Sequence, residues 1–130
     1  MNDDAGELVR QWTEKARNDW TAVEILLDSE QCPPETVCFH CQQFAEKLLK
    51  ALLTQHGIET PKTHDLRRLI QLAGRFAPEL SALSEPSDKL TIHGVETRYP
   101  GESYPVSGAE MNEIVEIARK FGDILRSKLE

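Results

Sequence analysis

Apolar residues recur at helical spacing along most of the chain, and no segment alternates convincingly with a period of two. The first predicted helix runs from about Glu7 to Asp28 and ends before the Cys32-Pro33-Pro34 turn. Its apolar face holds Leu8, Trp12, Ala16, Val23 and Leu27. The second predicted helix runs from about Pro34 to His56, where Gly57 suits the position that ends a helix. Its apolar face holds Val37, Cys41, Phe44, Leu48 and Leu52.

The second half of the chain predicts shorter pieces before one long helix. Thr63 suits the N-cap of a third helix, whose core face would hold Leu66, Ile70, Ala73 and Phe76. Pro78 begins a short turn that carries Leu80 and Leu83, and Ser87 is a candidate cap for a further short helix. Residues 99–108 form the clearest loop because they contain two prolines and two glycines. The last helix is predicted from about Ala109 to Lys128.

These segments predict an all-α fold: an up-and-down bundle of four main helices with a small extra one, formed by residues 1–130 as a single domain. The last helix is apolar over a wide arc. Its main apolar face holds Met111, Val115, Ala118, Leu125 and Leu129, and Ile114, Ile117, Phe121 and Ile124 widen it. Either this helix is central and fully covered, or it also packs against a second copy of the chain. We favour the second interpretation, a homodimer.

Charge changes the picture more than composition does. The chain is 39% apolar and 28% charged, as in a globular protein, and its net charge of −7 argues against a broadly basic nucleic-acid coat protein. Six basic residues lie between Lys47 and Arg75, against only Glu59 and Asp65, so this segment carries +4 and the remainder −11. Such a segment is either a solvated face, the commoner outcome, or a localised site for an anion such as phosphate.

Three groups of residues are candidates for phosphate contacts. His40, Gln43, Lys47 and Lys50 lie on one stripe of the second helix, beside its apolar face. Lys62 and His64 flank the start of the third helix, where free backbone amides favour anions. Arg98 and Tyr99 precede a Pro-Gly turn, from which an arginine can grip a phosphate with two hydrogen bonds. His64 has the alternative of a packing or capping role, and Arg98 that of tying the loop to an acidic helix face.

Other chemistry is not indicated. No apolar run is long enough for a membrane span, and the acidic start lacks a signal-peptide pattern, so we expect a cytoplasmic protein. Cys32, Cys38 and Cys41 are predicted to be structural, although His40 between the last two leaves zinc as an alternative. No catalytic motif or phosphate-binding glycine loop is present, so we predict no catalytic residue, metal or cofactor.

Four segments, in this order, resemble the HEPN family (higher eukaryotes and prokaryotes nucleotide-binding domain). They are Lys15-Ala16-Arg17-Asn18-Asp19, the stretch from Cys38 to Ala51, Lys62-Thr63-His64-Asp65-Leu66, and Arg98-Tyr99-Pro100. The resemblance covers almost the whole chain. It implies an all-α up-and-down bundle, often dimeric, that binds a minimal nucleotidyltransferase, in some cases as a toxin–antitoxin pair. It also implies nucleotide binding.

Several branches of that family are metal-independent RNases with an Arg-x4–6-His motif. In this sequence no Arg is followed by a His at that spacing, and after Arg98 the corresponding positions are Ser103, Tyr104 and Pro105. We therefore predict a non-catalytic partner of a minimal nucleotidyltransferase that binds a nucleotide or RNA phosphate. One alternative is an RNase in which a dimer brings His64 or His40 to Arg98. Another is a purely structural interaction module.

Overall fold

A computed structural model describes residues 4–94 and 105–129, and every regular element in them is helical. The elements are α1 (Asp4–Leu27), α2 (Pro34–Gln55), α3 (Leu66–Ala73), a 3-10 helix η1 (Pro78–Leu83), α4 (Ser84–Thr91) and α5 (Gly108–Arg126). The predicted all-α bundle is confirmed. Residues 95–104 contain Arg98 and Tyr99, so these two predicted site residues lie outside the described part of the chain.

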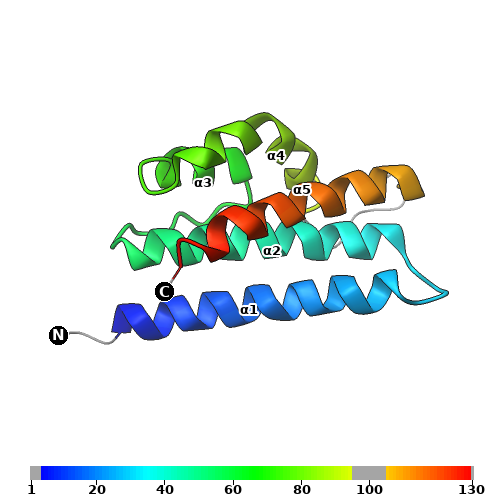
Figure 1. Cartoon of the computed structure of the whole chain (residues 1–130), viewed down its shortest axis with the longest axis horizontal. Coiled ribbons are helices and arrows are strands. Elements are labelled where there is room, and N and C mark those ends of the chain that lie inside the picture. The colour runs from blue at the N-terminus through cyan, green and yellow to red at the C-terminus, as the bar shows by residue number, and fades with distance from the viewer. Residues whose placement is uncertain (1–3, 95–104, 130) are drawn as a thin grey trace.

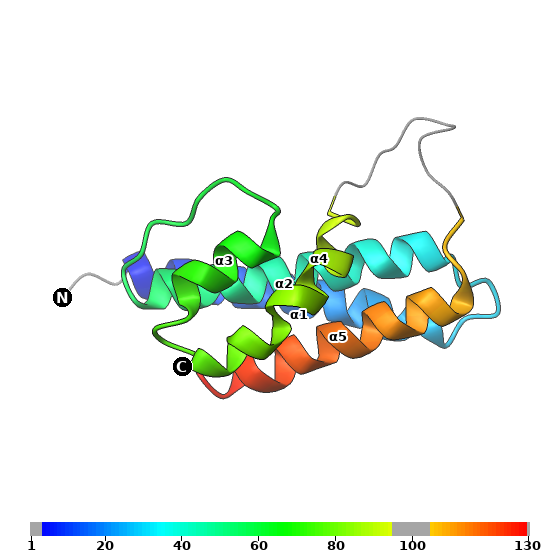
Figure 2. The same cartoon turned by 90° about the horizontal axis from the view of Figure 1, so that it is seen from above.

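The helix α2 lies at the centre and packs against α1, α3, α4 and α5. Figures 1 and 2 show α1 beside α2 in the opposite direction, α5 along another side, and the short helices on a third. α5 runs in the same direction as α2, since Gln55 at the end of α2 donates a hydrogen bond to the carbonyl of Lys128, 2.8 Å away. The third place in the bundle is therefore filled by three short pieces, α3, η1 and α4.

The breaks between the short pieces have local causes. Gly74 follows the last residue of α3, and Pro78 then starts η1 with a fixed φ. α4 begins at Ser84, so Ser87 lies inside the helix, where its hydroxyl donates to the carbonyl of Ser84 at 2.6 Å, and the prediction that Ser87 caps a helix was wrong. The longer α2 ends as predicted, because Gly57 adopts a φ of +73°.

The N-cap of α3 lies two residues later than predicted. Asp65, not Thr63, caps this helix, and its carboxylate accepts a hydrogen bond from the amide of Arg67 at 3.1 Å. Thr63 instead accepts a hydrogen bond from the amide of Asp65, also at 3.1 Å. The chain makes two successive short turns before the helix begins, which helical periodicity alone does not register.

The buried face of α1 differs from the predicted one. Trp20, which the prediction left out, is buried. Leu8 is 44% exposed, whereas Val9 is buried in its stead. A charged residue, Asp19, is buried on the same side of the helix as Ala16 and Val23. α1 therefore contributes a carboxylate as well as apolar side chains to its contact with α2.

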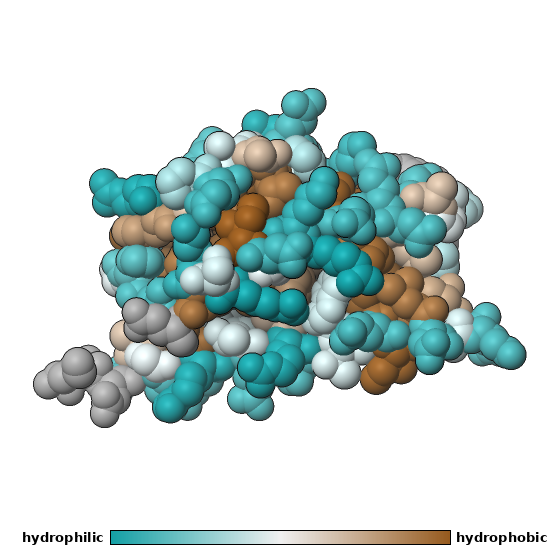
Figure 3. All heavy atoms as spheres, in the orientation of Figure 1, coloured by the Kyte–Doolittle hydropathy of each residue, from teal (hydrophilic) through white to brown (hydrophobic). Residues whose placement is uncertain are grey.

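The apolar breadth of α5 is used within one chain. Ile114, Ile117 and Phe121 are buried along with the main face, because α5 packs against η1 and α4 as well as α2. Much of the apolar arc is therefore covered within one chain, while Met111, Ile124 and Leu129 are only partly buried, and the homodimer stays a prediction. Figure 3 shows mostly hydrophilic residues over the side of the molecule seen in Figure 1, with hydrophobic atoms between them. None of the helices among the described residues is long and apolar enough to cross a membrane.

Candidate functional site

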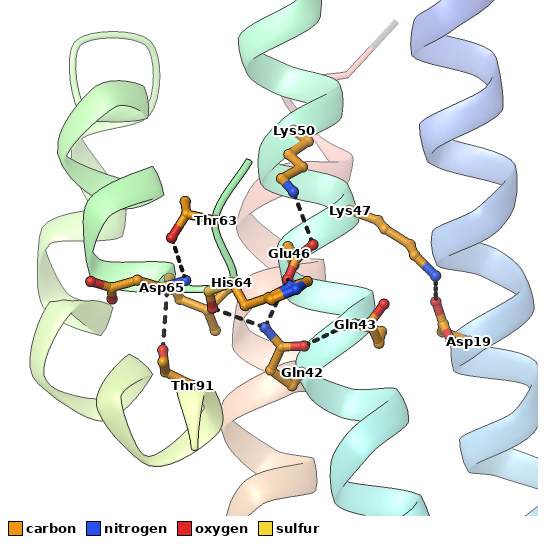
Figure 4. Close-up of polar contacts among 11 residues, drawn as sticks. Asp19, Gln42, Gln43, Glu46, Lys47, Lys50, Thr63, His64, Asp65 and Thr91 are labelled. Atoms are coloured by element: carbon orange, nitrogen blue, oxygen red, sulfur yellow. Dashed lines mark hydrogen bonds and ion pairs between the residues drawn. The ribbon is translucent and has the colours of Figure 1, made fainter. Parts of the chain in front are cut away.

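Four of the predicted site residues, His40, Gln43, Lys47 and Lys50, lie on one side of α2, and His64 approaches the same side from the segment before α3. Figure 4 shows this surface between α1 and the short helices. We call it the polar face of α2. It comprises His40, Gln42, Gln43, Glu46, Lys47 and Lys50 on α2 itself, Asp19 from α1, and His64.

The half of the polar face next to α1 is organised by Asp19. One oxygen of its buried carboxylate lies 2.8 Å from Nδ1 of His40. The other oxygen accepts a hydrogen bond from Nζ of Lys47 at 2.6 Å. The side chains of His40 and Lys47 are 28% and 20% exposed, so both reach the surface beside the carboxylate that holds them.

The other half is organised by Glu46, whose side chain is only 5% exposed. Its carboxylate accepts hydrogen bonds from Nε2 of Gln42 at 3.0 Å and from Nζ of Lys50 at 3.0 Å. Nδ1 of His64 lies 2.7 Å from the same carboxylate. Burial alone raises the pKa of Glu46, but the hydrogen bonds from these three partners outweigh it, so its pKa lies below the ordinary value. Glu46 is thus ionised at neutral pH.

Lys50 is as constrained as Glu46. Its side chain is 9% exposed, and its ammonium lies 5.6 Å from the centre of the Trp12 ring on α1 as well as beside Glu46. The indole nitrogen of Trp12 is buried and has no hydrogen-bond partner among the described residues. Lys50 is therefore a buried member of the network, and Lys47 is the more accessible of the two lysines.

Gln42 and Gln43 extend the network toward α4. Gln42 is fully buried and donates both to Glu46 and to the backbone carbonyl of His64, at 3.1 Å for the carbonyl. Since a carboxylate only accepts, Gln42 turns its nitrogen to Glu46 and its oxygen to Gln43, which donates at 2.8 Å. Gly94, just after α4, makes this packing feasible, because a Cβ there would lie 3.1 Å from the Gln42 amide and 3.2 Å from Cβ of His64.

A match to a family model identifies the protein family to which the chain belongs. The family model of the HEPN domain matches residues 9–128, which include all eight members of the polar face and all described helices apart from the first five residues of α1. The chain belongs to the HEPN domain family. This is a nucleotide-binding and RNase-type family, and the resemblance predicted from the sequence is confirmed. Comparisons with curated proteins and with solved structures gave no significant match.

The positive charge of this HEPN chain is distributed differently from what its middle segment suggests. Lys47 and Lys50 are paired with carboxylates that precede the segment, and Arg67 pairs with Asp88 on α4 at 2.7 Å. Within the described ranges, Lys62, Arg68 and Arg75 have no carboxylate partner. Of the predicted phosphate contacts that the structure describes, Lys62 alone is an unpaired cation.

Asp19, Gln42, Glu46 and Gly94 are the residues of the site that sequence reasoning missed. The pair Glu46 and Lys50 is separated by four positions on a helix, a spacing at which opposite charges meet, and this signal was available. Asp19 precedes Lys47 by 28 positions, so its role depends on how α1 packs against α2. Gly94 likewise acts through a contact between distant segments.

The cysteines of this HEPN domain lie away from the polar face. Cys38 and Cys41 are fully buried on α2, and burial raises the pKa of each thiol to about 12. In the described ranges no three His, Cys, Asp or Glu residues are grouped so as to hold a metal ion. His40, the residue that left zinc open, is instead held by Asp19.

A separate hollow of about 870 Å³ lies between η1, α4 and α5. Its charged lining consists of Arg67, Glu85, Lys89, Glu113, Glu116 and Lys120. Lys89 and Glu113 pair with one another across it. None of the predicted phosphate contacts that the structure describes lines this hollow, so it is distinct from the polar face of α2.

Proposed function

We propose that this HEPN protein is the non-catalytic partner of a minimal nucleotidyltransferase, as one half of a toxin–antitoxin pair, and that its polar face of α2 binds a phosphate group of a nucleotide or RNA. The pairing and the homodimer expected with it rest on the family, whose prokaryotic members the sequence resembles. The phosphate site rests on the geometry of the polar face.

One observation supports the phosphate site above the others: two buried carboxylates each hold one lysine and one histidine on the same side of α2. Burying ion pairs costs desolvation energy, and well-packed apolar residues of similar volume often stabilise a fold at least as well. Clusters of ionisable groups of this kind concentrate at functional sites. His40, Lys47 and His64 each keep part of their surface open to a ligand.

Calorimetric titration with ATP, GTP and a short RNA in low salt tests the phosphate site. We expect saturable binding that Lys47→Ala weakens by about tenfold, the loss of one charge-assisted hydrogen bond. Lys120→Ala is the matched control, because Lys120 is an exposed lysine on α5 that lines the other hollow. Absence of binding by the wild-type protein contradicts the phosphate site. Co-expression with a minimal nucleotidyltransferase, followed by gel filtration, tests the pairing separately, and separate elution of the two proteins contradicts it.

An RNase is the second candidate, because this is an RNase-type family and the two imidazoles of the polar face are oriented as acid–base catalysis requires. Carboxylates accept hydrogen bonds and do not donate them, so Nδ1 of His40 and of His64 carries the proton and Nε2 is the free edge. This is how proteins orient a histidine for acid–base work. The candidate predicts RNA cleavage in EDTA that Arg98→Ala abolishes. If RNA stays intact through long incubation with concentrated protein, the RNase function is contradicted.

A further inference from the structure

The fixed charges of the polar face cancel one another. The carboxylates of Asp19 and Glu46 each carry −1, and the ammonium groups of Lys47 and Lys50 each carry +1. The low pKa of Glu46 keeps that carboxylate ionised, since Gln42, His64 and Lys50 donate to it. A phosphate group that approaches this face therefore meets hydrogen-bond donors but no net positive charge from the lysines.

The two imidazoles are the groups that can change this sum. Each has Nδ1 on a carboxylate, 2.8 Å away for His40 and 2.7 Å for His64. Nε2 forms no hydrogen bond within residues 4–94 and 105–129, so it can accept a proton. The side chains are 28% and 60% exposed, so buffer reaches both. Imidazole is the side chain that ordinarily gains and loses its charge between pH 5 and 8.

The charged surroundings of each imidazole follow from the elements around it. Asp19 on α1 and Lys47 on α2 face His40, and they neutralise one another. Glu46 and Lys50 on α2 face His64 and do the same. Along the chain, Asp65 follows His64 but its carboxylate caps α3, Lys62 precedes it, and His93 lies at the end of α4. A lysine already neutralises the carboxylate beside each imidazole. Each added proton therefore gives the polar face one net positive charge.

We infer that His40 and His64, rather than Lys47 and Lys50, supply the net positive charge with which the polar face binds phosphate, so that phosphate and protons bind together. This inference rests on the proposed phosphate site and specifies how that site is charged. The proton comes from the buffer and forms an N–H bond with the lone pair of Nε2, and the new N–H then donates to a phosphate oxygen. The lysines contribute donors and hold the carboxylates in place.

Calorimetric titration of the whole protein with inorganic pyrophosphate, in buffers of the same pH but different ionisation enthalpies, counts the protons. We expect uptake of about one to two protons per pyrophosphate near neutral pH, and an affinity that falls by up to about tenfold per unit as pH rises from about 6 to 8. His64→Gln should lower both quantities, and His64 is exposed enough for this variant to fold. Lys120→Gln should change neither.

The outcomes separate this inference from the proposed function. If the wild-type protein binds pyrophosphate with no more proton uptake than His64→Gln and His40→Gln, the inference is overturned and the phosphate site stands. The same holds if His64→Gln and His40→Gln both bind with the pH dependence of the wild type. Absence of binding even at about pH 6 in low salt, where the imidazoles are most charged, overturns the inference and the phosphate site together. Pyrophosphate also titrates in this pH range, so the proton uptake that belongs to the imidazoles is the part lost in His64→Gln and His40→Gln.

Discussion

Both faces of α2 contain buried acids, but the partners of these acids differ, and their pKa values shift in opposite directions. On the apolar face, Cys38 and Cys41 have no hydrogen-bond donors to their sulfur atoms among the described contacts, and burial raises the pKa of each thiol to about 12. On the polar face, burial acts on Glu46 in the same direction, but Gln42, His64 and Lys50 donate to it and its pKa falls below the ordinary value. Burial alone therefore does not decide whether a group is charged, since its partners do.

The two faces also contribute differently to stability. The apolar face joins the core through side chains such as Phe44, which packs on Trp20 with ring centres 4.8 Å apart. The polar face is stable only as a complete set, because a buried charge that loses its partner is costly whereas a complete pair is close to neutral. This asymmetry gives the first and largest prediction.

Glu46→Ala should lower the free energy of unfolding by about 3–5 kcal/mol, since it leaves the ammonium of Lys50 buried without its carboxylate. Asp19→Ala should cost less, because Lys47 is 20% exposed and can turn to water. Urea denaturation measures both. As a control, Glu46→Ala combined with Lys50→Met should recover most of the loss. A double variant as unstable as the single one contradicts the view that the unpaired charge is the cause.

Gly94→Ala should have the second largest effect. It should lower the free energy of unfolding by about 1–3 kcal/mol, the usual effect of overpacking a tight site. The new methyl group would press on the Gln42 amide and on His64 at 3.1–3.2 Å, and both belong to the polar face. Gly108→Ala at the start of α5 is the matched control, because a Cβ there meets nothing within 4 Å. Thermal unfolding should show a loss for the first variant and no loss for the second. If Gly94→Ala and Gly108→Ala are equally stable, the proposed packing of Gly94 against Gln42 and His64 is contradicted.

The ionisation of Glu46 should be visible in how the free energy of unfolding changes with pH in acid. A carboxyl whose folded pKa is lowered stabilises the protein fully above its ordinary value of 4.5 and loses that contribution as pH falls through the lower folded value. Glu46→Gln keeps the side chain's shape but cannot ionise, so its stability should fall less steeply over that range than that of the wild type. Parallel profiles for the two proteins count against the pKa assigned to Glu46.

The smallest expected effect is on the rates at which the cysteines react. With a thiol reagent at mildly alkaline pH, Cys32 should react first because it is only half-buried, while Cys38 and Cys41 should react on the timescale of unfolding. Cys32→Ser should therefore remove the fast phase and leave the slow one unchanged. Fast modification of all three cysteines in the wild type shows instead that the apolar face opens readily.

Much of the fold is predictable from the sequence because local signals mark it. Pro34 and Gly57 bound α2 to within one residue, and Ser107 caps α5 by accepting from the amide of Glu110 at 3.0 Å. The short pieces between α2 and α5 are harder. Asp65 and Thr63 both suit an N-cap, and which one serves depends on Thr91 of α4, whose hydroxyl accepts from the amide of Leu66 at 3.1 Å.

The candidate site is predictable in five of its eight members, while Asp19, Gln42 and Glu46, and with them its net charge, were missed. The stripe of His40, Gln43, Lys47 and Lys50 follows from helical spacing. Figure 4 shows the last three on the polar face, and His40 shares the carboxylate of Asp19 with Lys47. Counting charges within residues 47–75 leaves out Asp19 and Glu46, which precede that segment and neutralise its two lysines. The pairing of Asp19 with Lys47 requires the packing of α1 on α2, which no local pattern contains.

The most direct measurement for the central claim, a phosphate site on the polar face of α2, is a titration of histidine-labelled protein with inorganic pyrophosphate followed by NMR. The ring signals of His40 and His64 should shift together and saturate. His56, which stacks on Phe76 at 3.8 Å at the far end of α2, is the internal reference and should stay in place. Signals of His40 and His64 that do not move, or that move only as much as that of His56, contradict the claim.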